Sequence, residues 1–252
     1  MRTWAVLFRR ELAAYFLSLV GYLVMVFFLV VMGAAFAFLL LNFRQAGETE
    51  SRVTEWFFSG FLFWMPMLIV PPILTMRLFS EEKSSGTIET LLTAPVTDWQ
   101  VVLAKFFGAL AFFIVLWLPT LGFVALTRFF SGPGSAPLDI TQLAAGYVGT
   151  FLVGGLFLAI GCLASALTRN QIIAALLAFA VVLLIFLIGF LGWFARQSGS
   201  PYQAALSYAS AIEHMMEFAR GRVDVRRLVF YLSTTAVFLL AAKLILEARK
   251  WR

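Results

Sequence analysis

The sequence has 252 residues, of which 62% are hydrophobic and only 13% are charged, and its mean hydropathy is +0.94. Soluble domains carry about 25% charged and about 45–50% apolar residues, so this composition excludes a soluble protein or a separate soluble catalytic domain. The net charge of +6 would suit a nucleic-acid partner in a soluble protein. Here Lys and Arg gather in short segments between apolar runs, which indicates membrane orientation and no nucleic-acid partner.

Six apolar runs are long enough to cross a bilayer, which takes about 20 residues per helix. The predicted spans are residues 18–42, 56–76, 104–128, 143–168, 171–195 and 228–246. The last charge-free run is short, but the side chain of Lys243 can reach toward the interface and extend it. We therefore predict an all-α integral membrane protein in which residues 1–252 form a single domain with six transmembrane helices.

The residues before the first span have an amphipathic pattern. Apolar side chains recur at helical spacing, at Trp4, Leu7, Phe8, Leu12, Tyr15 and Leu19. Arg9 and Arg10 fall on other faces of the same helix. This pattern predicts an interfacial helix in the headgroup plane, with a plain extension of the first span as the alternative.

The distribution of Lys and Arg sets the expected orientation. With the N-terminus in the cytoplasm, the first five spans follow the positive-inside rule, and six spans return the basic C-terminus to the same side. Residues 200–222 then form an external amphipathic segment. A seventh span over residues 201–219 is the alternative, but Glu213, His214 and Glu217 make it costly.

Proline and glycine mark places where the spans bend or approach closely. Pro66, Pro71 and Pro72 in the second span and Pro119 in the third each remove a backbone donor, and we expect them to act as hinges. The fourth span holds a series of small residues, Gly146, Gly149, Gly154, Gly155, Gly161 and Ser165. Such residues predict close helix packing, which would also suit contact between two copies of the chain.

Residues 79–97, between the second and third spans, form the densest polar stretch. They include Glu81, Glu82, Lys83, Gly86, Thr87, Ile88, Glu89, Leu91, Leu92 and Pro95. Gly86 or Thr87 can open a short helix that has Glu89 in its first turn. Ile88, Leu91 and Leu92 then share one face, and Pro95 ends the helix. Thr97 and Gln100 predict a capping box at the start of the next helix.

This segment resembles that of the permease subunits of type 2 ATP-binding-cassette transporters. An acid–base group, a Gly-Thr step with an aliphatic and an acidic residue, a Leu pair and a Pro follow in the same order, as Glu81-Glu82-Lys83, Gly86-Thr87-Ile88-Glu89, Leu91-Leu92 and Pro95. Arg9-Arg10-Glu11, followed by Tyr15-Phe16, is also similar to the start of those subunits. Within the group, the whole chain is most similar to the gliding-motility-associated and copper-enzyme-maturation permeases.

The resemblance implies that residues 79–97 are a cytoplasmic coupling helix seated in a groove of a separate ATPase. Glu82 and Glu89 are then candidates to pair with basic groups of that ATPase. The resemblance also implies two ATPase copies, a second copy of this permease or a related one, a place for an accessory envelope protein, and a bacterial inner membrane with both termini cytoplasmic. None of the four lysines follows a glycine, so ATP and Mg²⁺ are expected on the partner and no cofactor on this chain.

The predicted function is export or extraction of an unidentified substrate. Spans one, two and five are rich in Phe, and the resemblance implies that they line the path, which favours an amphipathic or lipid-linked substrate. The alternatives are a secondary carrier or channel, in which broken helices would bind ions through carbonyls, and a membrane scaffold of an envelope complex. A copurifying ATPase would separate the first reading from the other two.

No catalytic or metal-binding residue is expected. An intramembrane hydrolase needs a nucleophile or base inside a span, with a partner at matching depth. The only histidine, His214, lies in the external segment, where we expect it at the surface, and Asp98, Asp139 and Asp224 lie at loop positions. The chain is therefore predicted not to be an enzyme.

Overall fold

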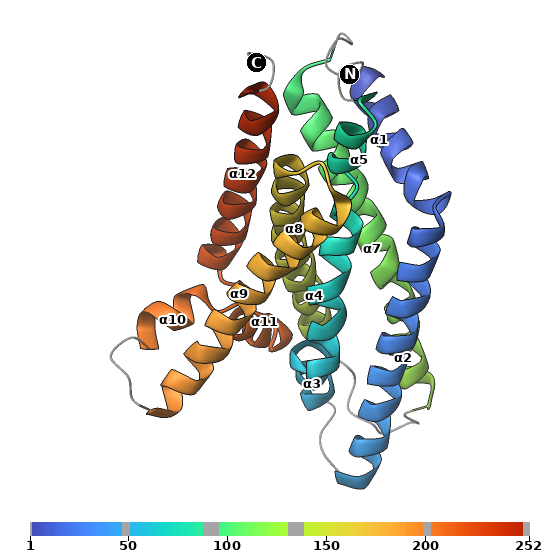
Figure 1. The fold of residues 1–252 in the computed structure, drawn as a ribbon. Coiled ribbons are helices and arrows are strands. Elements are labelled where there is room, and N and C mark those ends of the chain that lie inside the picture. Colours follow the sequence, from blue (N-terminus) through green and yellow to red (C-terminus); the bar gives the residue numbers. More distant parts are fainter. Residues whose placement is uncertain (1, 47–50, 88–95, 131–138, 199–202, 249–252) are drawn as a thin grey trace.

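The computed structural model describes residues 2–46, 51–87, 96–130, 139–198 and 203–248. The helices in these ranges are α1 (Arg2–Phe16), α2 (Leu19–Ala46), α3 (Ser51–Ser59), α4 (Phe61–Thr75), α5 (Ser80–Ser84), α7 (Asp98–Phe130), α8 (Ile140–Leu167), α9 (Gln171–Ser198), α10 (Gln203–Ala209), α11 (Ala211–Ala219) and α12 (Val225–Ala248) (Figure 1). Every regular element in the described ranges is a helix, and six helical stretches are long and apolar enough to cross a membrane. The prediction of an all-α, six-span membrane protein is confirmed.

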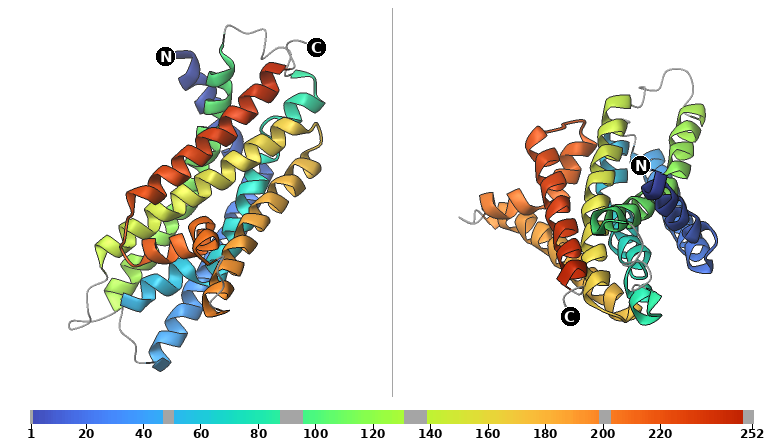
Figure 2. Two further views of the ribbon diagram at one scale, coloured as in Figure 1. Left: turned by 90° about the vertical axis from the view of Figure 1, so that its left-hand side faces the viewer. Right: turned by 90° about the horizontal axis from the view of Figure 1, so that it is seen from above.

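The two ends of the bundle differ in the elements they hold. The start of α1 and the end of α12 lie at the same end as α5 and the first turns of α7, and we call this the termini end (Figure 1). α3 and α11 lie toward the opposite end, which we call the α11 end. α2 and α12 are on opposite flanks of the bundle, with α8 between them, and α12 runs alongside α8 in both views of Figure 2.

The second span differs most from its prediction. It was expected at residues 56–76, but the structure breaks the chain at Gly60, so that α3 is a separate helix and the candidate span is Phe61–Ser84. A Cβ atom at Gly60 would lie 2.6 Å from the carbonyl oxygen of Trp56, so the sharp break there needs a glycine. α4 runs without a break through Pro66, Pro71 and Pro72, and the chain turns only after Thr75.

The glycines of α8 let other helices approach its backbone. An added Cβ would lie 2.5 Å from the Phe58 ring at Gly146, 2.6 Å from the Phe218 ring at Gly149 and 2.4 Å from the Phe113 ring at Gly154. α8 is accordingly the most buried candidate span, with a buried share of 78%, against 17% for α12. Close packing by the fourth span is confirmed, but the glycines serve contacts within one chain. Contact with a second copy of the chain stays a prediction.

The N-terminal helix α1 packs against α7. The Tyr15 and Phe112 rings stack at 5.0 Å between centroids, and the Trp4 ring meets the edge of Phe107 at 6.3 Å. A Cβ at Gly108 of α7 would lie 2.9 Å from the Cβ of Glu11, so the two backbones are in close contact there. The apolar face predicted for this helix is thus partly covered by protein over α1, whereas Leu19, which begins α2, is exposed.

The external segment predicted over residues 200–222 contains two short helices, α10 and α11. Neither is long enough to span a bilayer, and no seventh candidate span appears among the described residues. Ser210 separates the two helices: its hydroxyl accepts a hydrogen bond from Glu213 N at 3.1 Å and donates one to Gly189 O of α9 at 3.3 Å. Met215 and Phe218 are fully buried, because α11 packs on α3, α8 and α9.

Polar residues mark the starts of the long helices. Thr97 and Gln100 form the predicted capping box, with Gln100 N donating to Thr97 Oγ1 at 3.3 Å and Thr97 N donating to Gln100 Oε1 at 3.2 Å. Asp139 accepts from Thr141 N at 2.8 Å before α8, and Asp224 accepts from Arg226 N at 2.9 Å before α12. These bonds satisfy backbone donors that a helix leaves open at its first turn.

The contact between α4 and α8 gives the first testable prediction. A Cβ at Gly161 would lie 1.9 Å from Thr75 Oγ1 and 2.7 Å from Thr75 Cβ, so Gly161→Ala should force the helices apart and cost about 1–3 kcal/mol of stability. Gly155, in the same helix, has nothing within 4 Å of an added Cβ, so Gly155→Ala should be neutral or stabilise by up to about 1 kcal/mol. Thermal unfolding of the two purified variants measures the difference, and equal melting temperatures would contradict the packing described.

Candidate functional site

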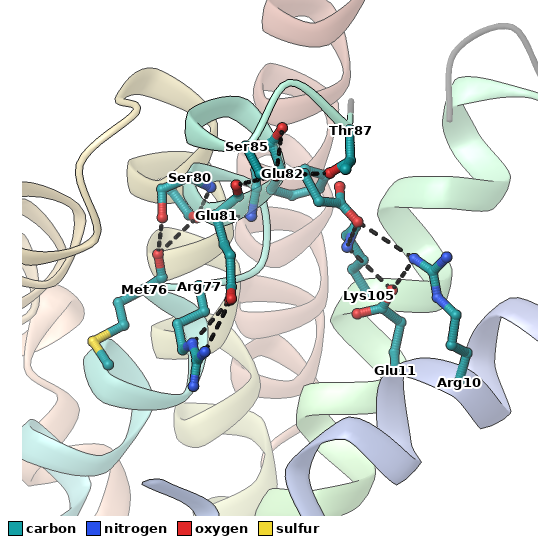
Figure 3. A network of polar contacts seen from close by, with 12 residues as sticks. Arg10, Glu11, Met76, Arg77, Ser80, Glu81, Glu82, Ser85, Thr87 and Lys105 are labelled. Carbon is teal, nitrogen blue, oxygen red and sulfur yellow. Dashed lines mark hydrogen bonds and ion pairs between the residues drawn. The ribbon is translucent and has the colours of Figure 1, made fainter. Parts of the chain in front are cut away.

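The most polar part of the described chain lies at the termini end, where α4 gives way to α5. α4 ends at Thr75, residues 76–79 turn, and α5 begins at Ser80. α1, α7 and α8 surround this turn, and Figure 3 shows the polar side chains that connect them. We call residues 76–84 the α4–α5 corner.

Ser165 of α8 holds the backbone of the α4–α5 corner. Its hydroxyl accepts hydrogen bonds from Phe79 N at 3.0 Å and Ser80 N at 3.1 Å, and donates to Met76 O at 3.2 Å. Ser80 Oγ donates to the same Met76 oxygen. All of these groups would otherwise be unsatisfied away from water, which is costly at the end of a helix. One buried serine therefore fixes the place where the second span turns.

Lys83 attaches α5 to the end of α8. Its side chain is buried, and its Nζ donates to Ala166 O in the last turn of α8. The last carbonyls of a helix lack backbone partners and carry negative partial charge, so an ammonium group is a favourable ligand for them. The corner is thus held to α8 by two side chains, Ser165 and Lys83.

On its other side, the corner is held by four charges from three helices. Lys105 Nζ of α7 lies 2.7 Å from Glu82 Oε1 and 3.1 Å from Glu11 Oε1, and Arg10 Nη2 lies 3.3 Å from Glu82 Oε1 and 3.0 Å from Glu11 Oε1 (Figure 3). The Lys105 side chain is only 4% exposed, and its Nζ also lies 5.5 Å from the centre of the Phe79 ring. Two positive and two negative charges compensate one another, as a buried ionic cluster requires.

A third connection joins the corner to the bend between α1 and α2. Arg77 donates from Nε and Nη2 to both oxygens of Glu81, at 2.9 and 3.0 Å, and from Nη1 to Ser18 Oγ at 3.2 Å. Nearby, Tyr15 OH donates to Leu74 O at 2.8 Å. Burial raises the pKa of Tyr15 well above its ordinary value, so the phenol stays protonated and remains a donor.

The predicted coupling residues divide into two groups. Ile88, Glu89, Leu91, Leu92 and Pro95 lie outside the described residues. Glu81, Glu82 and Lys83 are described, and all three make contacts within the chain. Glu82 was expected to pair with an ATPase; within the chain it is mostly buried, and its Oε1 pairs with Lys105 and Arg10.

Gly86 has the positive φ, 75°, that the predicted sharp turn needs. A side chain larger than glycine is strained in this region of backbone space. The hinge candidates Pro66, Pro71, Pro72 and Pro119 lie within continuous helices, and the first three are buried against the bundle. Of the N-terminal residues, Arg10 and Glu11 join the ionic cluster, whereas Arg9 is exposed.

Sequence reasoning missed Lys105, Arg77 and Ser165 as parts of this site. Lys105 falls at the start of a predicted span. The one feature of the sequence that singled it out is its position, a charged residue at the beginning of an apolar run. Ser165 lies four residues after Gly161, a spacing that places both on one helix face. That spacing indicated close packing, which the structure bears out, but not which backbone groups Ser165 would satisfy.

A second polar cluster lies at the α11 end. His214, expected at the surface, is only 4% exposed, and its Nδ1 lies 3.1 Å from Tyr231 OH. It is buried because α11 packs against the bundle and its histidine faces α12. Ion pairs join Arg227 to Glu217 at 2.9 Å and Arg220 to Glu55 at 3.3 Å. Among the described residues, no group of three or more His, Cys, Asp or Glu could hold a metal ion.

Comparison with known protein families identifies a match over most of the chain. The sequence model of a family described as "ABC-2 family transporter protein" matches residues 42–213, more than half of the chain. The matched region contains α3 to α10, the α4–α5 corner and the start of α11. A search of curated proteins finds no match.

The ionic cluster predicts a large effect of one substitution. Lys105→Met leaves Glu11 and Glu82 buried without their ammonium partner, which should cost about 3–5 kcal/mol of stability. Lys243→Met removes one partner of the more exposed Lys243–Glu247 pair on α12 and should cost about 0–1 kcal/mol. Melting temperatures in detergent measure both. Adding Glu11→Gln and Glu82→Gln to Lys105→Met should restore part of the loss; no restoration would show that the charges are not what matters.

The buried histidine predicts a dependence of stability on pH. Burial first, and then the positive charge of Arg227, lower the pKa of His214 to about 4. The unfolded chain, with an ordinary histidine pKa of about 6.5, binds more protons between these values, so stability falls as the pH falls from about 6.5 to 4. Between pH 7.5 and 5 the loss should be about 2 kcal/mol. His214→Gln should remove this part of the acid sensitivity in thermal melts, and an unchanged pH profile would contradict the assignment.

Proposed function

Because the chain belongs to the ABC-2 family of transporter proteins, we propose that it exports or extracts an amphipathic or lipid-linked substrate with energy from a separate ATPase subunit. The family match makes the chain a multi-pass membrane protein and the permease component of an ABC transporter, a part that is not itself catalytic. The nature of the substrate, the direction of transport and the arrangement of subunits are the proposed parts.

The observation that carries the proposal is the attachment of the α4–α5 corner to three other helices. The corner forms the first part of residues 79–97, the proposed coupling segment, and continues through residues 85–87 into residues 88–95, which would contact the ATPase. Ser165 and Lys83 connect it to α8, Glu82 connects it to α7 through Lys105, and Arg10 and Glu11 extend the connection to α1. A force applied to residues 88–95 would therefore act on the contacts of the corner with α1, α7 and α8, as coupling of ATP binding to a membrane movement requires.

The proposed complex holds two ATPase copies and two permeases, the second being another copy of this chain or a related one. ATP and Mg²⁺ bind to the ATPase subunits. Residues 88–95 would then face the cytoplasm, as would both termini. The start of α1 and the end of α12 lie at the same end of the bundle as the corner (Figure 1). We further propose a bacterial inner membrane, an accessory envelope protein, and a place in the gliding-motility and copper-enzyme-maturation branch.

Transport would follow from relative movement of the spans. Approach of the two ATPases on binding ATP would push residues 88–95 of each permease. The corner would pass this push to α4 and α7, in which Pro66, Pro71, Pro72 and Pro119 remove helix hydrogen bonds and lower the cost of bending. A path would then open between the two permeases.

The coupling segment is tested by Leu91→Asp combined with Glu89→Arg. If Leu91 is buried in a groove of the ATPase, its apolar contact contributes about 1.5–3 kcal/mol, and the double variant should abolish ATPase association or substrate-stimulated hydrolysis. The permease itself should still insert and fold, because the segment connects two spans rather than forming one. Copurification and ATP hydrolysis measure the outcome.

The matched control is Val223→Asp combined with Arg222→Glu. Both residues are exposed in the turn between α11 and α12, at the other end of the bundle, so ATPase association should be unchanged. Normal stoichiometry and transport in the Leu91 and Glu89 variant would show that residues 88–95 are only a solvated loop. Absence of any associated ATPase with the native chain would favour a carrier, a channel or a scaffold.

A further inference from the structure

A cavity of about 600 Å³ lies between the bend that joins α1 to α2 and the α4–α5 corner. Its size is within the range of small-molecule sites, which is about 300–1,000 Å³. Leu17, Val20, Ile73 and Leu74 provide an apolar wall, and Arg77 and Glu81 provide a charged one. The cavity thus has two chemically different sides.

The two walls meet where α2 begins and α4 ends. Val20 is in the first turn of α2, and Ile73 and Leu74 are in the last turn of α4. Arg77 follows Ile73 by four residues, which is about one helical turn, or about 5.4 Å. The change from apolar to charged lining therefore takes place over the short distance at which a bilayer changes from hydrocarbon to head groups. A molecule that fits both walls is an amphiphile lying in a membrane.

Arg77 and Glu81 can still bind a ligand although they bind each other. An arginine has five N–H donors, and Arg77 uses three of them, two to Glu81 and one to Ser18. Each carboxylate oxygen of Glu81 accepts one bond from Arg77 and keeps a second acceptor site. The side chains of Arg77 and Glu81 are 38% and 46% exposed, so both signs of charge are accessible.

The charged side chains that line the cavity sum to zero, so they do not select a ligand with a net charge. Glu11, Glu82 and Lys105 are mostly buried in the ionic cluster, where they compensate one another together with Arg10. Arg77 and Glu81 compensate each other in the same way. A lining that is neutral overall but offers a separate donor and acceptor is complementary to a zwitterion rather than to an anion or a cation.

We propose that this cavity binds the zwitterionic head group of a membrane phospholipid. Its phosphate lies at Arg77 and Ser18, its ammonium group at Glu81, and the start of its acyl chains along Leu17, Val20 and Ile73. The inference rests on the proposed function, since it names the class of amphiphile that the permease would receive from the bilayer. It assigns Arg77 and Glu81 to ligand binding rather than to contact with the ATPase.

The test measures lipid retention by the full-length purified chain. Native mass spectrometry compares phosphatidylethanolamine with phosphatidylglycerol, whose head group is anionic. We expect phosphatidylethanolamine to be retained about tenfold more strongly. Arg77→Gln combined with Glu81→Gln removes both charges without leaving one unpaired, and should abolish this preference. The control is Lys243→Gln with Glu247→Gln, another pair four residues apart, on α12; it should leave the preference intact.

Val20→Trp provides a second variant, in which the ion pair remains and a larger side chain fills the cavity. It should weaken retention of phosphatidylethanolamine about tenfold. The proposal would be overturned if both variants retained phosphatidylethanolamine as strongly as the control does. It would also be overturned if the native chain preferred phosphatidylglycerol. Competition by free glycerophosphoethanolamine as strong as by the intact lipid would also overturn it, because the apolar wall would then have no role.

The outcome can be separated from that of the coupling experiment, since lipid retention needs no ATPase. If ATPase association depends on Leu91 and Glu89 but lipid retention does not depend on Arg77 and Glu81, only the lipid site fails. If the lipid is retained as expected but no ATPase binds the native chain, the transporter mechanism fails and the lipid site stands.

Discussion

The close contact between α4 and α8 is the constraint on which the termini end of the molecule depends. Gly161 lets the α4 backbone come near enough for Ser165, one turn later, to reach three backbone groups of the α4–α5 corner. A larger residue at Gly161 would meet Thr75 and move these donors and acceptors out of hydrogen-bond distance. The position of α5, and with it the approach of Glu82 to Lys105 and of Lys83 to the end of α8, follows from this one contact. Electrostatic attraction alone would not place α5 so closely, because ionic contacts between side chains tolerate a range of geometries.

The consequence is a corner that is held on two sides by different kinds of interaction. Toward α8 the contacts are hydrogen bonds to backbone groups, which are directional and have one satisfactory geometry. Toward α1 and α7 they are ion pairs, in which Arg10 is exposed and Lys105 is buried. A push on the following segment would therefore carry α8 along as a rigid partner, whereas the contact with α1 can lengthen or exchange its partners. In the proposed mechanism, the corner and α8 therefore move together relative to α1 and α2, which lie on the flank of the bundle.

The sequence predicted an all-α protein with six spans because apolar length is a property of the chain itself. It also predicted the capping box at Thr97 and Gln100 and the close packing of the glycines in α8, since both depend on short, fixed spacings. It did not predict which partners the charges near the corner would choose. Glu82 has a basic neighbour in sequence, Lys83, yet binds Lys105 and Arg10, which only the folded chain brings near. The burial of His214 was also missed, because it too depends on contacts that only the folded chain creates. An amphipathic pattern shows that one face of a helix is apolar, but it does not show that other helices cover the polar residue beside that face.

The cavity and the α4–α5 corner share the helix α5, and this helix relates the lipid site to the proposed coupling mechanism. Glu81 and Glu82 are adjacent in α5, but they face different elements. Glu81 pairs with Arg77, four residues earlier, so this pair moves with the corner. Glu82 pairs with α1 and α7, and Arg77 reaches Ser18 at the bend before α2. A displacement of the corner away from α1 would lengthen the contacts of Glu82 with Arg10 and of Arg77 with Ser18, and leave the Arg77–Glu81 pair intact. The charged wall of the cavity would then withdraw from the apolar wall at Leu17 and Val20, so the movement proposed to couple ATP to transport is also one that would release a head group held between them.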